Sequence, residues 1–236
     1  MAIELEQYLQ EQLERLPEDH PDRKFLLKQL GVVKGYDSSA RESLPTTELD
    51  IENEWQRQAN ELARFFAEEL RMTREEYIAS LPQFTSQPEA FKCRFNIPVI
   101  VETRVSPKRQ CELAGINPLL DTLECQDWSS DPKDYRTPDT PYVTWMNDGR
   151  PNLNTPVMTV REILEDDERG GTIFDGIALY IVHPKILKDH FLDLPGTQFG
   201  LDKAPYLFDR DGQPRLYYRK VDGADSSYGS VVCGKA

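Results

Sequence analysis

The chain has 236 residues, of which 41 are acidic and 28 are basic, and its net charge is −13. This length can bury a core without disulfide bonds, and the strong negative charge disfavours the phosphate backbone of nucleic acids and anionic membrane surfaces. We therefore expect a protein whose partners include no nucleic acid and no membrane.

No pattern typical of export or membrane insertion is recognisable. Residues 1–16 are polar and acidic, whereas a secretory signal is basic and then apolar, and no apolar run approaches the ~20 residues of a membrane helix. We predict a cytoplasmic location. The four cysteines contain no CxxC pair, and reduced thiols are favoured over disulfides: Cys93, Cys111, Cys125 and Cys233.

The first 90 residues are predicted to be a helical region that carries most of the negative charge. It holds 19 acidic and 10 basic side chains, a net of −9. Apolar residues recur at helical spacing in residues 3–16 and 22–30. A polar stretch at about 34–46 is predicted to be a linker.

The longest helix is predicted from about residue 48 to residue 72. One apolar stripe runs through it: Ile51, Trp55, Ala59, Leu62, Phe66 and Leu70. Thr73 and Glu76 then form a capping box, which predicts a new helix over residues 74–80.

Residues 91–236 are predicted to form the second domain. Glycine and proline become more frequent there, as expected of a segment with many turns. β-branched or alternating patterns predict five strands: 97–104, 142–146, 204–208, 214–221 and 228–233. Residues 209–213 predict a hairpin connection of intermediate length.

Several short helices are predicted to interrupt these strands. Ser106 is expected to cap a helix at 107–114, and Thr159 a helix at 160–168. Pro184 is expected to begin a helix that extends to residue 191. The polar segment 126–140 is predicted to be a surface loop.

Residues 173–182 (IFDGIALYIV) fit two structures. Their β-branched content favours a strand. However, Thr172 and Asp175 fit a capping box, and isoleucine recurs at every fourth position, so we favour a helix.

These elements predict an α+β fold. The helical N-terminal third, residues 1–90, is expected to pack on or extend from a mainly antiparallel or mixed sheet domain, residues 91–236, that has several short helices.

Several short motifs lie between Pro141 and Cys233: Tyr142-Val143, Asp148-Gly149, Gly176-Ile177-Ala178-Leu179, Pro184 with Leu187, Leu194 with Gly196, Pro205 with Leu207, and Gly229 with Cys233. With these motifs the segment resembles the second half of an uncharacterised bacterial protein family. Asp175 stands where that family prefers Glu, and Thr197-Gln198 replaces a Ser-Arg pair, so any ligand role of that arginine is lost here. The resemblance implies a bacterial origin, a helix at 173–182 and a strand-rich tail, and it implies no activity.

No motif predicts a catalytic residue, a metal site or a cofactor. His183 and His190 are seven residues apart, which is wider than the i,i+4 pair typical of zinc sites. Asp209-x-Asp211-Gly212 lacks the later glutamate of a calcium loop and is better explained as a turn. P-loop, Rossmann and nucleophile-elbow patterns are also missing from the sequence.

The candidate binding residues are therefore few: His183, Arg219 and Cys233. Cys233 could form a nucleophile–base–orienter set with His183 and a carboxylate such as Asp175, although a buried strand cysteine is the favoured interpretation. Strand alternation places Arg215, Tyr217 and Arg219 on one face, where they could bind an anionic ligand. Pairing of these arginines with neighbouring carboxylates is the favoured alternative.

The apolar stripe on residues 48–72 raises a second class of function. Its aromatic side chains are candidates for an interface: Trp55, Phe65 and Phe66. The stripe either packs on the protein's own sheet, which we favour, or seals a homodimer or receives a partner helix. We thus expect an interaction or scaffold protein that is not an enzyme. The alternative is an enzyme or small-molecule binder with its site in residues 141–233.

Overall fold

The computed structural model describes residues 15, 50–128 and 135–235, and within these the predicted α+β fold is confirmed. The predicted helices at 3–16 and 22–30 and the linker at 34–46 lie outside the described residues, apart from Arg15. None of the described helices is long and apolar enough to cross a membrane.

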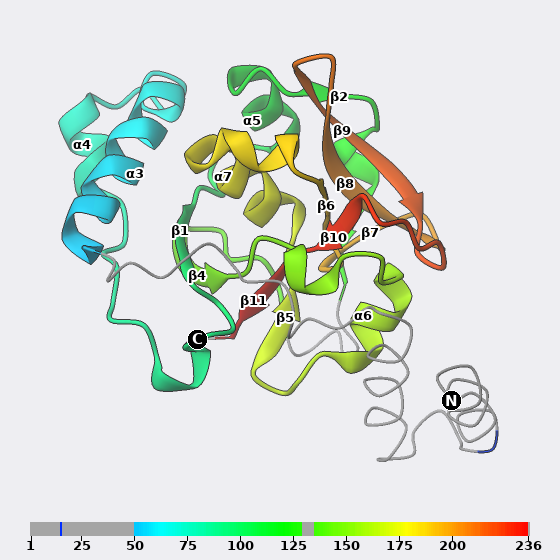
Figure 1. Ribbon diagram of the computed structural model, residues 1–236. Helices are drawn as coiled ribbons and strands as arrows, with labels where there is room; N and C mark the ends of the chain where they lie inside the picture. The colour runs from blue at the N-terminus through cyan, green and yellow to red at the C-terminus, as the bar shows by residue number, and fades with distance from the viewer. Residues whose placement is uncertain (1–14, 16–49, 129–134, 236) are drawn as a thin grey trace.

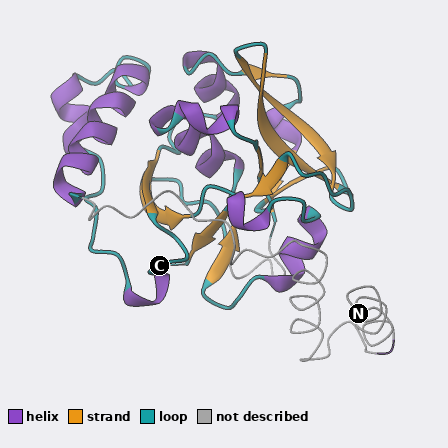
Figure 2. Cartoon of the chain, viewed as in Figure 1, coloured by secondary structure: helices purple, strands orange, loops and turns teal. Residues whose placement is uncertain are grey.

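The described elements follow one another in this order: α3 (Ile51–Phe66), α4 (Arg74–Ala79), η2 (Glu89–Phe91), β1 (Ile97–Val101), α5 (Pro107–Leu113), β2 (Asn117–Pro118), η3 (Thr122–Glu124), β3 (Cys125–Asp127), β4 (Tyr142–Met146), η4 (Arg150–Asn152), α6 (Val157–Ile163), β5 (Glu168–Gly170), α7 (Ile173–Val182), η5 (Pro184–Lys188), β6 (Phe191–Asp193), β7 (Thr197–Phe199), β8 (Lys203–Arg210), β9 (Gln213–Lys220), β10 (Tyr228–Ser230) and β11 (Val232–Gly234). Figure 2 separates the helices from the strands.

The strands form two sheets. The first has the order β1-β4-β11-β5 and is antiparallel throughout. The second has the order β10-β6-β8-β7-β3, and β9 joins it beside β8. It is mixed, because β10 pairs with β6 in parallel and β2 pairs with β9 in parallel.

The predicted final strand is in fact two strands in different sheets. β10 belongs to the second sheet and β11 to the first, and the buried Val231 lies between them. Its amide donates to the carbonyl of Asp193, and its carbonyl accepts from the amide of Gly171. Val231 therefore connects the two sheets. The residue pattern of 228–233 gives no sign that the strand is divided there.

The central helix is α7, the segment for which the sequence also allowed a strand. Both halves of the predicted capping box form between Thr172 and Asp175. Almost every residue of α7 is buried, and the helix contacts α3, α5, β1 and β8. A continuous apolar surface is expected of a helix enclosed on all sides.

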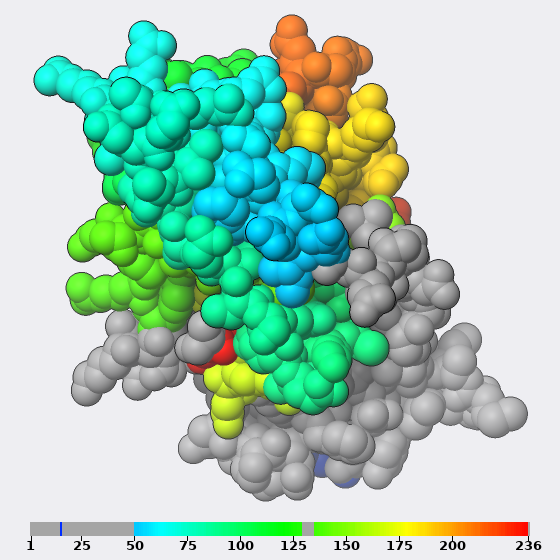
Figure 3. Space-filling model, turned by 90° about the vertical axis from the view of Figure 1, so that its left-hand side faces the viewer, coloured from blue at the N-terminus to red at the C-terminus, as the bar shows by residue number. Residues whose placement is uncertain are grey.

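Helices α3 and α4 cover one side of the molecule (Figure 3). The stripe residues Trp55, Leu62 and Phe66 join the same buried cluster as β1 and α7. Gln58 is fully buried on α3, and its amide donates to the carbonyl of Pro98 and accepts from the amide of Ile100. This side chain replaces a strand partner at the free edge of β1.

Three predicted helices differ from the structure in their bounds. α3 ends at Phe66 and not near 72, and the chain turns at Arg71, which has a φ of 56°. α6 spans Val157–Ile163, and Pro156 stands at its N-cap position without a side-chain cap, so Thr159 lies inside the helix. The helix expected at 184–191 is the 3-10 helix η5, and Phe191 begins β6.

The β8–β9 hairpin is tighter than predicted. Arg210 pairs with Gln213, so only Asp211 and Gly212 form the turn. Both have positive φ, 59° and 77°, which is the backbone of the type I′ turn that Asp-Gly favours. The short turn keeps β8 and β9 in register along their whole length.

Candidate binding surface

One side of the second sheet carries aromatic and arginine side chains. Residues paired across neighbouring strands point to the same side, and alternate residues of a strand share a side. Tyr206 pairs with both Asp193 and Tyr217, and Tyr228 pairs with Phe191. We call this surface the aromatic–arginine face: Phe191, Tyr206, Phe208, Arg215, Tyr217, Arg219 and Tyr228.

The opposite side of the same strands is aliphatic. Leu192, Leu207 and Leu216 point to it and are completely buried against the core that includes α7. On the aromatic–arginine face the rings remain partly exposed, except for Tyr206, which is 9% exposed. The sheet thus buries its leucines and leaves its rings at the surface.

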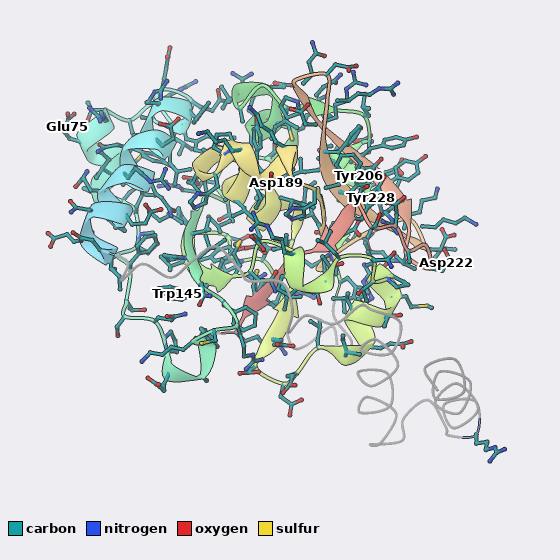
Figure 4. The ribbon with its side chains drawn as sticks, in the orientation of Figure 1. Glu75, Trp145, Asp189, Tyr206, Asp222 and Tyr228 are labelled. Atoms are coloured by element: carbon teal, nitrogen blue, oxygen red, sulfur yellow. The ribbon has the colours of Figure 1, made fainter. Side chains whose placement is uncertain are left out.

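The rings form one connected cluster. Phe191 lies 5.0 Å from Tyr228 and 5.6 Å from Phe208 between ring centroids, in edge-to-face arrangements. Tyr206 lies 5.1 Å from both Phe208 and Tyr228, and Figure 4 shows Tyr206 and Tyr228 side by side. Tyr217 extends the cluster to β9, 6.4 Å from Tyr206. Such pairs contribute about 0.5–1.5 kcal/mol each beyond their buried area.

Two buried side chains beneath these rings lack hydrogen-bond partners. Asp193 and Ser230 are paired in the parallel register of β6 and β10, and both are fully buried. Asp193 Oδ1 and Ser230 Oγ have no hydrogen-bond partner. Burial raises the pKa of Asp193 to about 7, Arg219 opposes that rise, and Asp225 adds to it.

The two arginines of the face differ in how they are held. The Arg219 guanidinium lies 3.4 Å from Asp193 Oδ2, stacks 4.1 Å from the centroid of Tyr228, and donates to the carbonyl of Gly223. Arg215 has a buried Nε without a hydrogen-bond partner, and no ion pair holds it within the part of the chain that the structure describes. Carboxylate pairing, which the sequence favoured for both arginines, thus holds for Arg219 alone.

The face is also locally basic in an acidic protein. Alternation along the hairpin places Arg210 on the same side as Arg215 and Arg219. The outward positions of β8 and β9 include no carboxylate. The acidic residue of the face is therefore the buried Asp193, which Arg219 contacts.

The gap between two glycines determines where β10 runs. A Cβ on Gly229 would lie 2.4 Å from the carbonyl oxygen of Gly149, and one on Gly149 would lie 2.7 Å from that of Gly229. Only glycine fits both positions. The predicted Asn147-Asp148-Gly149 turn thus packs directly on the strand that carries Tyr228 and Ser230.

The structure does not bring the three predicted binding residues together. His183 ends α7, where burial and Arg57 lower its pKa. Cys233 is buried on β11, where burial raises its pKa to about 12. No hydrogen bond, ion pair or ring contact joins either residue to Arg219. Among the three, only Arg219 belongs to the aromatic–arginine face.

The predicted helical interface is covered by the protein itself. Phe66 is completely buried and Trp55 is 9% exposed, with its indole donating to the carbonyl of Pro82. Phe65 is partly buried against the same core. The apolar stripe of α3 therefore packs on the chain's own strands and on α7.

A second Asp–Arg pair is buried at the start of α7. Arg169 on β5 contacts Asp175 on α7 through two bonds of 2.5 and 3.1 Å. Tyr142 and Thr172 also donate to Asp175. These donors lower the pKa of Asp175 although burial opposes them. The described residues contain no group of three or more His, Cys, Asp or Glu side chains suited to a metal ion.

Sequence reasoning missed most of the face. It identified Arg215, Tyr217 and Arg219 from the alternation in β9. Phe191 and Asp193 were assigned to a helix or left without a role, because the three-residue strand β6 has no local signal. The pairing of Tyr228 with Phe191 depends on β6 and was missed for the same reason.

Comparison with known proteins adds no relative: no family model, no curated protein and no solved structure matches this chain.

Proposed function

We propose that this protein is a non-enzymatic interaction protein that binds an acidic segment of a partner polypeptide on the aromatic–arginine face. The observation that carries the proposal is the combination of five clustered rings with two arginines, of which Arg215 has a buried Nε without a hydrogen-bond partner among the described residues. Tyrosine and arginine are enriched among the residues that dominate binding energy at protein interfaces.

Charge supports an acidic partner. Three arginines point outward from β8 and β9 without an outward carboxylate, while the chain as a whole carries −13. Complementary charge speeds encounter and suppresses wrong partners. Because the protein as a whole is acidic, a basic partner is attracted to most of its surface and is not directed to one place. An acidic segment is directed to this face by its arginines.

This proposal moves the interaction surface from the helices to the sheet. Residues 48–72 remain a weaker candidate for an assembly region, because their apolar stripe is already buried within the chain. The sheet face lined by rings provides contact area that is still partly exposed.

The test is selection of peptides from a phage-displayed library of random dodecapeptides. The full chain is the target, and the Arg215→Ala/Tyr217→Ala double variant removes general binders. We expect enriched peptides that combine Asp or Glu with aromatic residues. Their affinity for Arg215→Ala should be at least about 10-fold weaker, or ~1.4 kcal/mol.

The matched control is Arg64→Ala on α3. Arg64 is 70% exposed and pairs with Glu61, so its substitution by alanine removes the same charge from another surface. Selected peptides should bind this variant with unchanged affinity. Equal losses in Arg64→Ala and Arg215→Ala, or no peptide that distinguishes the wild type from the double variant, would overturn the proposal.

A small-molecule binder remains the second candidate. Asp193 Oδ1 and Ser230 Oγ are buried without partners, and a ligand with hydroxyl or amine donors could satisfy both. A thermal-shift screen of amines and polyols distinguishes the two functions. A compound whose stabilisation is lost in Ser230→Ala but kept in Arg215→Ala favours the small-molecule site.

A further inference from the structure

The outer edge of the β8–β9 hairpin is open over half of β9. β9 pairs with β8 along all eight residues, whereas β2 covers it only at Arg215 and Leu216. The last backbone hydrogen bond between this segment and β9 is the amide of Leu119 donating to the carbonyl of Leu216, and the amide of Met158 on α6 donates to the carbonyl of Val221, just after β9. Beyond this point, no described strand lies beside β9 (Figure 1).

The backbone groups that face this edge follow from the register. The carbonyl of Leu216 points away from β8, toward Leu119, so those of Tyr218 and Lys220 also point away from β8. The amide of Val221, at an odd position, donates to Asp202 on the β8 side, as this alternation requires. Tyr218 and Lys220 therefore present two amides and two carbonyls without a strand partner among the described residues.

The side chains at this edge are basic and aromatic. Lys203 and Lys220 are directly opposite each other in the β8–β9 register, and like charges in that position are destabilising. Neither lysine forms an ion pair with a residue that the structure describes. Lys203 lies 4.5 Å from the ring centroid of Tyr218, which stacks 4.5 Å from Tyr217 on the aromatic–arginine face.

We infer that an extended acidic polypeptide segment adds to β9 as a new strand, paired with Tyr218 and Lys220. This inference rests on the proposed function and specifies its binding mode. Main-chain hydrogen bonds supply affinity in strand addition, and alternate side chains supply specificity. A carboxylate of the added strand neutralises the Lys203–Lys220 pair on one side of the sheet, and the next side chain points to the other side, toward Tyr217 and Arg219.

A second copy of this chain is the less favourable occupant of the edge. Pairing of two β9 edges about a two-fold axis juxtaposes the same Arg219 and Lys220 side chains from both copies. Each copy also carries a net charge of −13, which opposes approach. An acidic segment of another polypeptide pairs with the basic edge without placing like-charged side chains opposite each other.

The test uses a proline substitution that removes one outward amide. The amide of residue 220 points away from β8, so Lys220→Pro leaves the β8–β9 ladder intact, and proline is tolerated on such edges. Lys220→Ala is the matched control, because it removes the charge and keeps the amide. Urea unfolding of both variants confirms that they remain folded.

Binding is measured by fluorescence anisotropy with the acidic dodecapeptides selected against the full chain. We expect Lys220→Pro to bind at least about 10-fold more weakly than Lys220→Ala. N-methylation at successive peptide positions should weaken binding at every second position, because a strand directs alternate amides to one neighbour.

The outcomes separate this inference from the proposed function. Equal affinity of Lys220→Pro and Lys220→Ala, together with a loss in Arg215→Ala, overturns strand addition and leaves the acidic-partner function standing. The absence of any selected peptide sensitive to Arg215→Ala overturns both. A concentration-dependent dimer that Lys220→Pro abolishes assigns the edge to a second copy and also overturns the inference.

Discussion

The two Asp–Arg pairs each contain a fully buried aspartate. The carboxylate oxygens of one aspartate all have hydrogen-bond partners, whereas one oxygen of the other has none. Asp175 receives two bonds from Arg169 and further bonds from Tyr142 and Thr172. Asp193 has one contact of 3.4 Å with Arg219, and its second oxygen has no partner. The pKa of Asp175 is lowered, and that of Asp193 is raised to about 7.

This difference separates a structural pair from one at a candidate interaction surface. A buried charge is tolerated when it is paired and its remaining lone pairs are satisfied. Asp175 meets that condition, and it also forms one half of the capping box of α7. Asp193 does not meet it, yet it positions Arg219 over the Tyr228 ring. Poor satisfaction at this site is consistent with a role other than stability.

The largest effect is expected from Asp175→Ala. The substitution leaves the guanidinium of Arg169 buried without its counter-charge and removes one half of the capping box of α7. Loss of one partner of a buried pair costs about 3–5 kcal/mol. The measurement is the free energy of unfolding in urea at pH 7. A loss below ~1 kcal/mol contradicts the assignment of a structural pair.

The second effect is the pH dependence of stability, in which the two carboxyls act in opposite directions. Because the pKa of Asp193 is raised from about 3.8 to about 7, the folded chain retains a proton that the unfolded chain releases. Its contribution to stability therefore falls as the pH rises through this window and is constant above it. Asp175 has a lowered pKa, so its contribution is present above its ordinary pKa and is lost on acidification below it.

Asp193→Asn isolates the contribution of Asp193 because every other titrating group is shared. We expect the stability of the variant relative to wild type to increase by about 2–4 kcal/mol between pH 4 and pH 8. Urea unfolding at one-unit intervals measures that difference. A difference independent of pH shows that Asp193 titrates alike in the folded and unfolded chains.

The local structure around Asp175 was easier to predict from the sequence than that around Asp193. Thr172 and Asp175 are a local capping signal, so the start of α7 was correctly predicted. β6 spans three residues and exists because β8 and β10 flank it. Its pairing, and hence the burial of Asp193, depends on residues far away in the chain and has no periodicity to detect.

Predictions of turns and helix ends also succeeded where the signal is local and failed where it is not. The Asp-Gly dipeptide predicted a hairpin, although its length was overestimated. Ser106 was correctly identified as a cap, whereas Thr159 was not a cap because α6 begins two residues earlier, at Val157. Three of the seven residues of the aromatic–arginine face were readable from β9 alone. The other four required knowing which strands are neighbours.

The smallest effect is expected from removing one phenol hydroxyl at each pair. Tyr142 donates to Asp175 at 2.8 Å in a buried site, and hydrogen bonds to charged groups contribute about 1.5–3 kcal/mol. Tyr228 is a partly exposed residue, so water can replace what its hydroxyl contributes. Tyr142→Phe should therefore lower the free energy of unfolding by about 1.5–3 kcal/mol, and Tyr228→Phe by less than ~1 kcal/mol.

The two tyrosine variants also test what the Tyr228 ring does. Phenylalanine keeps the aromatic face on which Arg219 stacks, so Tyr228→Phe should retain the binding of selected acidic peptides, whereas Tyr228→Ala should lose it. Neither substitution touches Asp175. If Tyr228→Phe destabilises the chain as much as Tyr142→Phe, the two pairs are equally structural. An unsatisfied carboxylate then does not mark the interaction surface, because Asp193 and its tyrosines would contribute to stability in the same way as Asp175.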